Sequence, residues 1–489
     1  MYSFIISLVA LVLGYFLYGT FVEKVFGPDP SRPTPATTKA DGVDFIKMPS
    51  WKVFMIQFLN IAGTGPIFGA IMGAKFGPAS YLWIVLGCIF AGSVHDYLTG
   101  MLSLRNGGAS LPELVGKYLG RGARSAMLVF SVILLLLVGT VFVFSPALIL
   151  GDIAGDGSKA AIMIWVGVIF LYYIIATLMP VDKVIGKIYP VFAFALLFMA
   201  AALMVMLFVK WPSIPEVWDG LQNRGPSIGM NGQPIFPCLL ITIACGAISG
   251  FHGTQSPLMA RCLNNEKHGR PIFYGAMITE GIVALVWAAV ASWFFFDGGA
   301  AEVGSTVAAA APTVVTTVSR SWLGILGGIL AILGVVAAPI TSGDTAFRST
   351  RLIIADFLRY DQKKWRNRLI VAIPLFLAAS LLLWFNVANE DGFNIIWRYF
   401  GWANQTLAAF SLWTATVYLA RENRHRAAWL IAFIPAVFMT AVSVTYICTA
   451  KIGFNMPGST IPYLAGVSSI VSAGAFLIWK TRQKTVKNQ

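Results

Sequence analysis

Long apolar runs alternate with short polar loops along nearly the whole chain. Thirteen of these runs reach the roughly 19 residues that a helix needs to cross about 30 Å of hydrocarbon. They lie near residues 2–22, 52–76, 80–103, 125–150, 160–180, 188–209, 236–261, 271–296, 321–345, 368–387, 393–420, 427–448 and 460–479. The pattern therefore predicts an all-α polytopic membrane protein with about 13 transmembrane helices.

Two of these runs carry helix-breaking residues near their middle. The second contains Gly63-Thr64-Gly65-Pro66, and the seventh has glycines from Gly246 to Gly253. Unwinding a spanning helix frees backbone groups, which is tolerated only where protein or a water-filled cavity satisfies them. Both breaks come about 10 residues, or roughly 15 Å, into their helices, near the bilayer midplane. Such paired breaks predict the buried solute site of a secondary transporter.

The spacing of the two broken helices predicts an internal repeat. They are spans 2 and 7, and an offset of five places them in opposite directions, as an inverted repeat requires. We therefore expect two five-helix halves, at 52–209 and 236–420, joined by an external loop at 210–235. Residues 1–51 would form an N-terminal span and a cytoplasmic connector, and residues 421–489 two peripheral spans with a basic cytoplasmic tail.

Residues 299–319 are apolar but small, and Pro312 interrupts them. We interpret this segment as re-entrant or surface-lying, because a true span here would switch the side of every later loop.

Composition supports a membrane protein, since 57% of residues are hydrophobic and 11% are charged, against about 25% charged in soluble domains. The net charge of +14 does not indicate nucleic-acid binding, because 28 of the 35 Lys and Arg residues fall in alternate loops and the C-terminal tail. By the positive-inside rule, the N-terminus lies outside and the C-terminus in the cytoplasm. The loop after span 9 is predicted to form a topogenic, lipid-facing basic surface from Arg348, Arg351, Arg359, Lys363, Lys364, Arg366 and Arg368.

The first apolar run lacks a basic n-region and is expected to remain as a span. The five cysteines, Cys88, Cys238, Cys245, Cys262 and Cys448, show no Cys-x-x-Cys spacing, so we interpret them as packing residues. No metal site and no cofactor other than a coupling ion, H⁺ or Na⁺, is predicted.

Three segments carry a resemblance to a known family. They are NIAGTGPIFGAIMGAKFGPASYLWIVLGCIFAGSVHDYLTGMLSLRNGG, GFHGTQSPLMARC and APITSGDTAFRS. These blocks, spread across roughly residues 50–410, closely resemble the carbon starvation protein A family. The resemblance implies a peptide transporter of the bacterial cytoplasmic (inner) membrane that responds to carbon starvation, with close relatives that transport pyruvate with protons. It also implies the five-plus-five, LeuT-like architecture of the amino acid–polyamine–cation superfamily.

Polar residues at membrane depth are the candidates for substrate binding, because they are costly unless paired or hydrated. The half-helix after Pro66 could hold a substrate carboxylate at its N-terminus, although Gly63 and Gly65 could instead only permit close packing. His252 could bind a carboxylate, relay a proton or bond a neighbouring carbonyl. Asn404, with Gln405, could complete the site or form a plain interhelical hydrogen bond. The predicted substrate-binding residues are Gln57, Asn60, Gly63, Thr64, Gly65, Ser249, His252, Thr254, Gln255 and Asn404.

A second set of residues is predicted to couple transport to an ion. Hydroxyls at Thr341, Ser342 and Thr345 are hard oxygen ligands suited to sodium, and the resemblance implies such a role for a Ser/Thr pair on the eighth core helix. The alternative is that they bond back to helix carbonyls.

Acids within the spans are the other coupling candidates. Glu280 lies roughly 14 Å into span 8 and is a better candidate for a proton carrier than Asp96 in span 3. His95 and Asp96 could form a relay or a fixed ion pair, and Asp344 could be only an interfacial charge beside Arg348.

We compare three functional classes: a coupled secondary transporter, a channel and an intramembrane enzyme. A channel would need pore-lining rings from several subunits, and an enzyme would need a compact nucleophile or metal constellation. The sequence also lacks a P-loop, which argues against ATP-driven pumping. We therefore expect a non-enzymatic symporter that imports small peptides by ion-coupled alternating access. The alternative is a proton- or sodium-coupled pyruvate symporter. The partners expected are a small peptide or pyruvate and the lipid bilayer.

Overall fold

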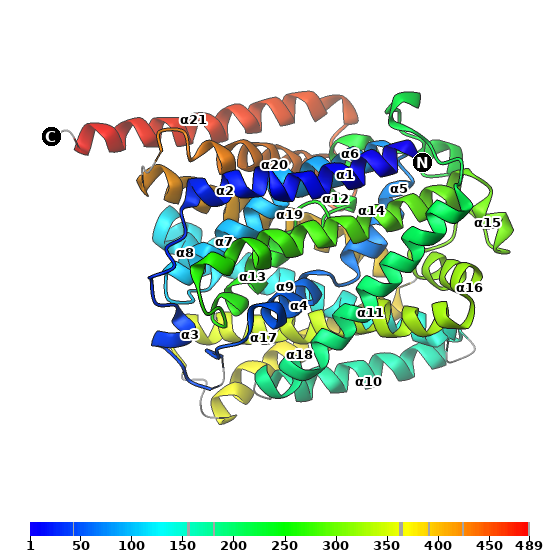
Figure 1. Cartoon of the computed structure of the whole chain (residues 1–489), viewed down its shortest axis with the longest axis horizontal. Coiled ribbons are helices and arrows are strands. Elements are labelled where there is room, and N and C mark those ends of the chain that lie inside the picture. The colour runs from blue at the N-terminus through cyan, green and yellow to red at the C-terminus, as the bar shows by residue number, and fades with distance from the viewer. Residues whose placement is uncertain are drawn as a thin grey trace.

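The computed structural model describes residues 1–42, 44–153, 157–178, 181–360, 365–389, 392–422 and 425–487. All regular elements within these residues are helices, most of which run along one common direction in a single bundle (Figure 1). The first helix begins, and the last helix ends, at opposite ends of this bundle (Figure 1). The predicted all-α, multi-pass architecture is confirmed.

The number of spans is only partly confirmed. Ten described helices are long and apolar enough to cross a membrane, or eleven if the bent pair Ser50–Ile61 and Gly65–Ala74 counts as one span. The predicted span 321–345 overlaps this set only through Ala311–Leu330, which begins within the segment interpreted as re-entrant or surface-lying. Two other predicted spans are not in this set. One is 236–261, which is broken into short pieces, and the other is 393–420, which forms the 31-residue helix Gly392–Glu422. Thirteen spans therefore stay a prediction.

The first predicted half begins with the broken span. The helix α4 ends at Ile61, and after a short non-helical stretch a π-helical turn, Gly65–Gly69, leads into α5. The helical segment Gly65–Ala74 is bent by 54° from α4. Pro66 has no N–H to donate and so favours this interruption. The helices of this half are α4 (Ser50–Ile61), α5 (Ala70–Ala74), α6 (Ala79–Gly87), α7 (Ser93–Arg105), α8 (Leu111–Leu119), α9 (Arg121–Ile153), α10 (Lys159–Leu178) and α11 (Val181–Lys210).

The second half repeats this pattern. After α12 the chain unwinds through Gly246, whose φ of +91° is a left-handed conformation that favours glycine. It becomes helical again at Gly250. The helices of this half are α12 (Leu240–Thr242), α13 (Gly250–Ala260), α14 (Gly275–Phe296), α15 (Gly299–Glu302), α16 (Ala311–Leu330), α17 (Ala337–Leu358), α18 (Trp365–Ala388) and α19 (Gly392–Glu422). Assignment of these halves as an inverted repeat stays a prediction.

The segment 299–319 does not continue straight into span 9. It contains α15 and the first part of α16, and Gly324 turns the chain within α16 with φ 60° and ψ −141°. The helix after this turn continues through the π-helical turn Ala331–Val336 into α17.

Span 9 extends to Leu358, beyond its predicted end at residue 345. Arg348 and Arg351 therefore lie inside α17 and are almost fully buried, so their predicted place in a cytoplasmic loop is wrong. The physical reason is pairing: the Arg348 guanidinium donates to the carbonyl of Ala176 and lies 3.8 Å from Asp344. Lys363 and Lys364 lie outside the described residues.

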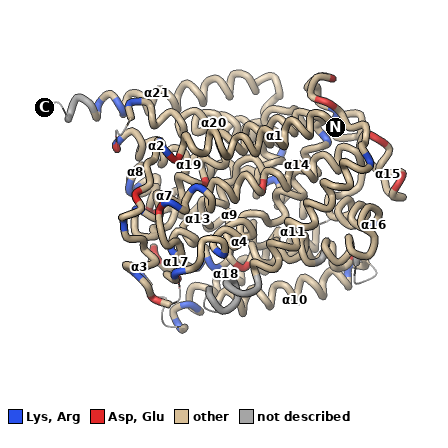
Figure 2. The backbone as a smooth tube through the Cα atoms, viewed as in Figure 1, with Lys and Arg blue, Asp and Glu red and all other residues tan. Residues whose placement is uncertain are grey.

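The remaining helices flank the core. They are α1 (Tyr2–Phe16), α2 (Tyr18–Phe26), α3 (Pro35–Thr38), α20 (Leu430–Thr449) and α21 (Ile461–Lys487). Lys and Arg gather mainly at the end of the bundle where α3, α7 and α8 lie (Figure 2). This asymmetry agrees with the predicted topology, in which the basic end faces the cytoplasm.

Candidate functional site

The two interruptions meet inside the bundle. A side chain at Gly65 would overlap Cys245, and a Cβ at Gly246 would lie 3.7 Å from the Cα of Pro66. Gly65 is therefore required by the close approach of the opposite segment, whereas Gly246 is required by its positive φ and by Ala284, whose Cβ would lie 2.5 Å away. The two broken helices cross at the residues where each loses its helical hydrogen bonds.

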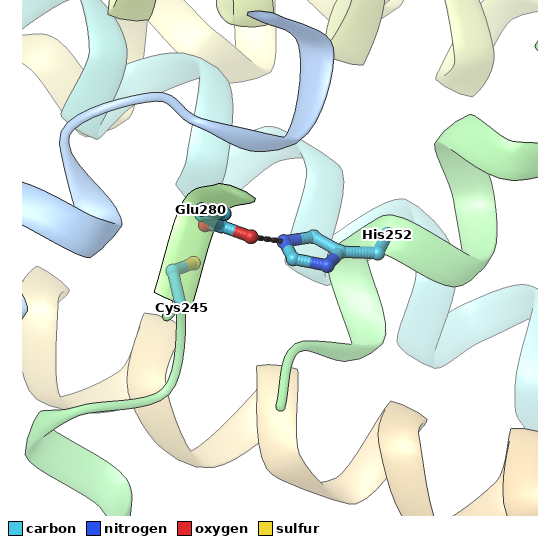
Figure 3. Close-up of side chains that lie close together, drawn as sticks. All are labelled: Cys245, His252 and Glu280. Atoms are coloured by element: carbon cyan, nitrogen blue, oxygen red, sulfur yellow. Dashed lines mark ion pairs between the residues drawn. The ribbon is translucent and has the colours of Figure 1, made fainter. Parts of the chain in front are cut away.

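A chain of four charged or titratable side chains lies at this crossing. The Asp96 carboxylate, on α7, joins two histidines: its Oδ1 lies 2.7 Å from His95 Nδ1 and its Oδ2 lies 2.9 Å from His252 Nδ1 on α13. The other nitrogen of His252, Nε2, lies 3.4 Å from Glu280 Oε2 on α14 (Figure 3). We call His95, Asp96, His252 and Glu280 the acidic cluster. All four are at most 1% exposed.

The electrostatic balance of the acidic cluster is unusual. It contains two carboxylates, and within the described residues no Lys or Arg forms an ion pair with either one. Buried charges are costly unless they are compensated. Both oxygens of Glu280, and Nε2 of both histidines, also lack a hydrogen-bond partner among the described residues. The cluster can therefore be neutralised by bound protons or by a bound cation.

Three residues at the crossing offer ligand atoms for a metal ion. The donor atoms of Cys245, His252 and Glu280 all lie within 4.8 Å of one another (Figure 3). Asp96 bonds the second nitrogen of His252, an arrangement that commonly orients metal-binding histidines. Thiolate, imidazole and carboxylate together suit a transition-metal ion. The sequence alone predicted only a packing role for Cys245.

Polar residues before the first break lie near this crossing and leave hydrogen-bonding capacity unused. Gln57 donates to Ser256 Oγ at 3.2 Å, which joins α4 to α13. Both amide atoms of Asn60 and the hydroxyl of Thr64 are buried without a partner among the described residues. Such groups are costly unless water or a ligand satisfies them.

The half-helix after Pro66 is less open than the sequence suggests. The amides of Ile67 and Phe68 both bond the carbonyl of Thr64. The predicted binding of a substrate carboxylate at this N-terminus stays a prediction. Gly63 has a packing role, because a Cβ there would overlap the ring of Phe142.

Asn404 caps the second half-helix. Its Oδ1 accepts hydrogen bonds from the Phe251 amide at 2.7 Å and from Ser249 Oγ at 3.1 Å. This geometry matches the interhelical hydrogen bond that the sequence left as an alternative. Gln405, next to it, donates to the carbonyl of Leu240.

Thr254 and Gln255 also have local partners. The Thr254 hydroxyl donates to the carbonyl of Phe251, and the Gln255 amide donates to Thr254 and to Ser349 Oγ. Of the polar side-chain atoms of these two residues, the Gln255 carbonyl oxygen is the one that lacks a hydrogen-bond partner among the described residues.

The predicted ion site on α17 forms a separate group. Ser342 Oγ donates to the carbonyl of Leu59 at 2.9 Å, which brings a hydroxyl of α17 to the carbonyls of α4 near the first break. Thr341 and Thr345 instead bond carbonyls three or four residues earlier in their own helix, as the alternative reading expects. One of the three hydroxyls thus contacts the broken span.

Asp344 differs from its prediction. It is fully buried, and its carboxylate accepts a hydrogen bond from the Tyr189 hydroxyl at 2.9 Å. It is not an interfacial charge, because α17 continues well past it. Tyr189, which also bonds the carbonyl of Thr341, was not identified from the sequence.

The acidic cluster lies outside two of the cavities that the described residues form. One, of about 460 Å³, lies beside α5, α12 and the start of α19. The other, of about 630 Å³, lies at the basic end beside Arg261 and Asp356. Neither is lined by a member of the cluster, so protein separates the cluster from both.

Comparison with known proteins gives consistent matches over most of the chain. A family model described as carbon starvation protein CstA matches residues 1–164, 154–323 and 298–446. An uncharacterized membrane protein of Haemophilus influenzae is 46% identical over 336 residues, which cover 60% of this chain and 91% of that protein. The peptide transporter CstA of Escherichia coli is 26% identical over a 574-residue alignment covering 92% of this chain and 81% of its own. That of Campylobacter jejuni is 27% identical over 562 residues, covering 91% and 79%.

Solved structures give a second line of comparison. A manganese transporter of Eremococcus coleocola matches with a TM-score of 0.57 at 12% identity, covering 90% of this chain and 98% of its own. A Na⁺-coupled sialic acid symporter matches with a TM-score of 0.54 at 13% identity, covering 96% of each chain. At these identities the likeness shows the fold alone, which is of the LeuT-like type.

Proposed function

Because the chain belongs to the carbon starvation protein CstA family, we propose that it is a secondary active transporter that imports small peptides by ion-coupled alternating access. It is a multi-pass membrane protein, and curated relatives across most of its length are named peptide transporters. The single observation that carries the proposal is the acidic cluster, buried where two broken helices cross.

The charge of the acidic cluster favours a peptide over pyruvate. A peptide carries an α-ammonium group, which the carboxylates of Asp96 and Glu280 would attract. Pyruvate carries only a carboxylate, which the same two groups would repel when ionised. Asn60 and Thr64 add buried hydrogen-bonding groups, without partners among the described residues, that suit a peptide bond. The proposed substrate therefore binds with its amine at Glu280 and its backbone beside the first break.

Protons are the coupling ion that this geometry supports best. Two carboxylates and two imidazoles form one continuous chain, in which a proton can be held at Glu280 Oε2, His252 Nε2 or His95 Nε2. Because the cluster has two carboxylates, a proton held on the His95–Asp96–His252 part and an ammonium group at Glu280 can be bound together, as proton-driven import requires. Sodium is the second candidate, favoured by the contact of Ser342 with the Leu59 carbonyl.

Alternating access follows from the position of the acidic cluster. It lines neither of the two cavities described above, so we expect that exposing it to either side requires the broken helices to move. We propose that α4–α5 and α12–α13, with their partner helices, rock against the rest of the two halves at 52–209 and 236–420. Ion and substrate would tip this motion through their different affinities for the two states.

Uptake into liposomes tests this function. Purified protein would be reconstituted, and labelled tripeptide and labelled pyruvate would each be offered under an imposed proton gradient and then a sodium gradient. We expect tripeptide uptake driven by the proton gradient. Pyruvate uptake without peptide uptake would indicate a monocarboxylate symporter instead. Uptake driven by the sodium gradient would indicate that the coupling ion is sodium, bound near Ser342.

A further inference from the structure

The cavity of about 460 Å³ has an unusual charge. Its walls come from the end of α5, from α12, from the start of α19 and from the loops around residues 230–234 and 450–458. Lys75, Arg398 and Lys451 line it, and among its described lining residues none is acidic. We call it the basic cavity.

The basic cavity contains a large share of the Lys and Arg residues that are predicted to lie on its side of the membrane. Only seven Lys and Arg residues fall on the side of the membrane predicted to be external, and three of the seven line this one cavity. Within the described residues none of the three forms an ion pair. Lys210, on the same side, pairs instead with Glu302 at 2.8 Å. The basic cavity thus keeps a positive potential that would attract anions.

A line of aromatic rings connects the basic cavity with the acidic cluster. Trp397 lines the cavity and packs on Phe400 with ring centroids 5.5 Å apart. Phe400 meets Phe142 at 6.4 Å, and Phe142 meets Phe251 at 6.0 Å. Phe251 directly precedes His252. The rings thus form a continuous series of contacts from the cavity wall to the residue that precedes His252.

The two regions differ in sign along this path. Arg398 precedes Asn404, which caps the half-helix carrying His252, by six residues on α19, or about 9 Å of helix. A fully extended tripeptide spans at most about 10 to 11 Å. Arg398 and the residue that caps the half-helix carrying His252 are therefore separated along α19 by no more than about the length of a tripeptide.

We propose that the basic cavity is an anion-binding entry site that takes the C-terminal carboxylate of the peptide, so that the amine points toward the acidic cluster. This rests on the proposed function, because it assumes a peptide substrate. It adds the orientation of that substrate and a binding site for its carboxylate, formed by Lys75 and Arg398.

The test compares a labelled tripeptide with the same peptide carrying a C-terminal amide. Uptake kinetics would be measured for the wild type, Lys75→Gln, Arg398→Gln and the double variant, with gel filtration to check folding. We expect each single change to raise KM for the free-acid peptide about two- to fivefold, as for an exposed ion pair. KM for the amidated peptide should not change, and kcat should be retained for both.

Lys210→Gln is the matched control, because it removes a cation on the same side that does not line the cavity. Equal effects of Arg398→Gln on both peptides, or an equal effect of Lys210→Gln, would overturn the proposal. The assay would be repeated with and without anionic phospholipid, since a lipid phosphate could occupy the same cations. An effect seen only with anionic lipid would also overturn it. Absence of any wild-type peptide uptake would instead refute the proposed function.

Discussion

Replacing Glu280 with glutamine removes one of the two carboxylates of the acidic cluster while keeping the size of the side chain. Glu280 is fully buried, and its Oε2 lies 3.4 Å from His252 Nε2. Truncating one partner of a buried charge pair costs about 2 to 5 kcal/mol. At 1.4 kcal/mol for each tenfold change, kcat/KM for a peptide with a free amine should fall by about 30-fold to a few thousand-fold.

The assay is initial uptake by reconstituted Glu280→Gln protein, with a tripeptide and its N-acetylated analogue as substrates. The wild type should prefer the free amine, and the variant should lose this preference, because glutamine cannot pair with an ammonium group. Glu302→Gln serves as the control, since Glu302 is half-exposed and pairs with Lys210 outside the cluster. Unchanged kcat/KM in a folded Glu280→Gln variant would refute the assignment of the amine to Glu280.

Three further changes have distinct expected outcomes. Gly65→Val should abolish uptake, because the new side chain would overlap Cys245. Membrane insertion, measured by fractionation, should persist, and normal uptake would show that the proposed site is in the wrong place. Ser342→Ala should keep proton-driven uptake and lose about 0.5 to 1.5 kcal/mol of stability with its bond to Leu59; loss of uptake would favour sodium coupling. Asn404→Ala should lower the unfolding temperature by removing a helix cap worth about 0.5 to 2 kcal/mol; an unchanged temperature would contradict the capping role.

The helical fold and the broken spans were predictable because they depend on local sequence. Apolar run lengths predict spanning helices, and Gly63 to Pro66 predicts an interruption whatever surrounds it. The end of span 9 was predicted wrongly because it depends on contacts between residues that are distant in the chain. Arg348 and Arg351 are typical of a loop by composition, but contacts with distant partners such as the Ala176 carbonyl bury Arg348 within α17.

The candidate site was predictable as a list of residues but not as a geometry. His95, Asp96, His252 and Glu280 were each identified as polar groups at membrane depth. Only the fold shows that one carboxylate joins two histidines, because His252 is distant from Asp96 in the chain. The same holds for the basic cavity, because Lys75, Arg398 and Lys451 come from three separate segments of the chain that only the fold brings together.

The most direct test of the central claim, that the peptide binds where the two broken helices cross, is photoaffinity labelling. A tripeptide with a photoreactive group on its first residue would be bound to the purified protein, irradiated, and its attachment points identified by mass spectrometry. We predict labelling within residues 57–66 and 245–256 that excess unlabelled tripeptide prevents. Labelling of these segments that the competitor does not reduce, or competed labelling confined to other segments, would contradict the claim.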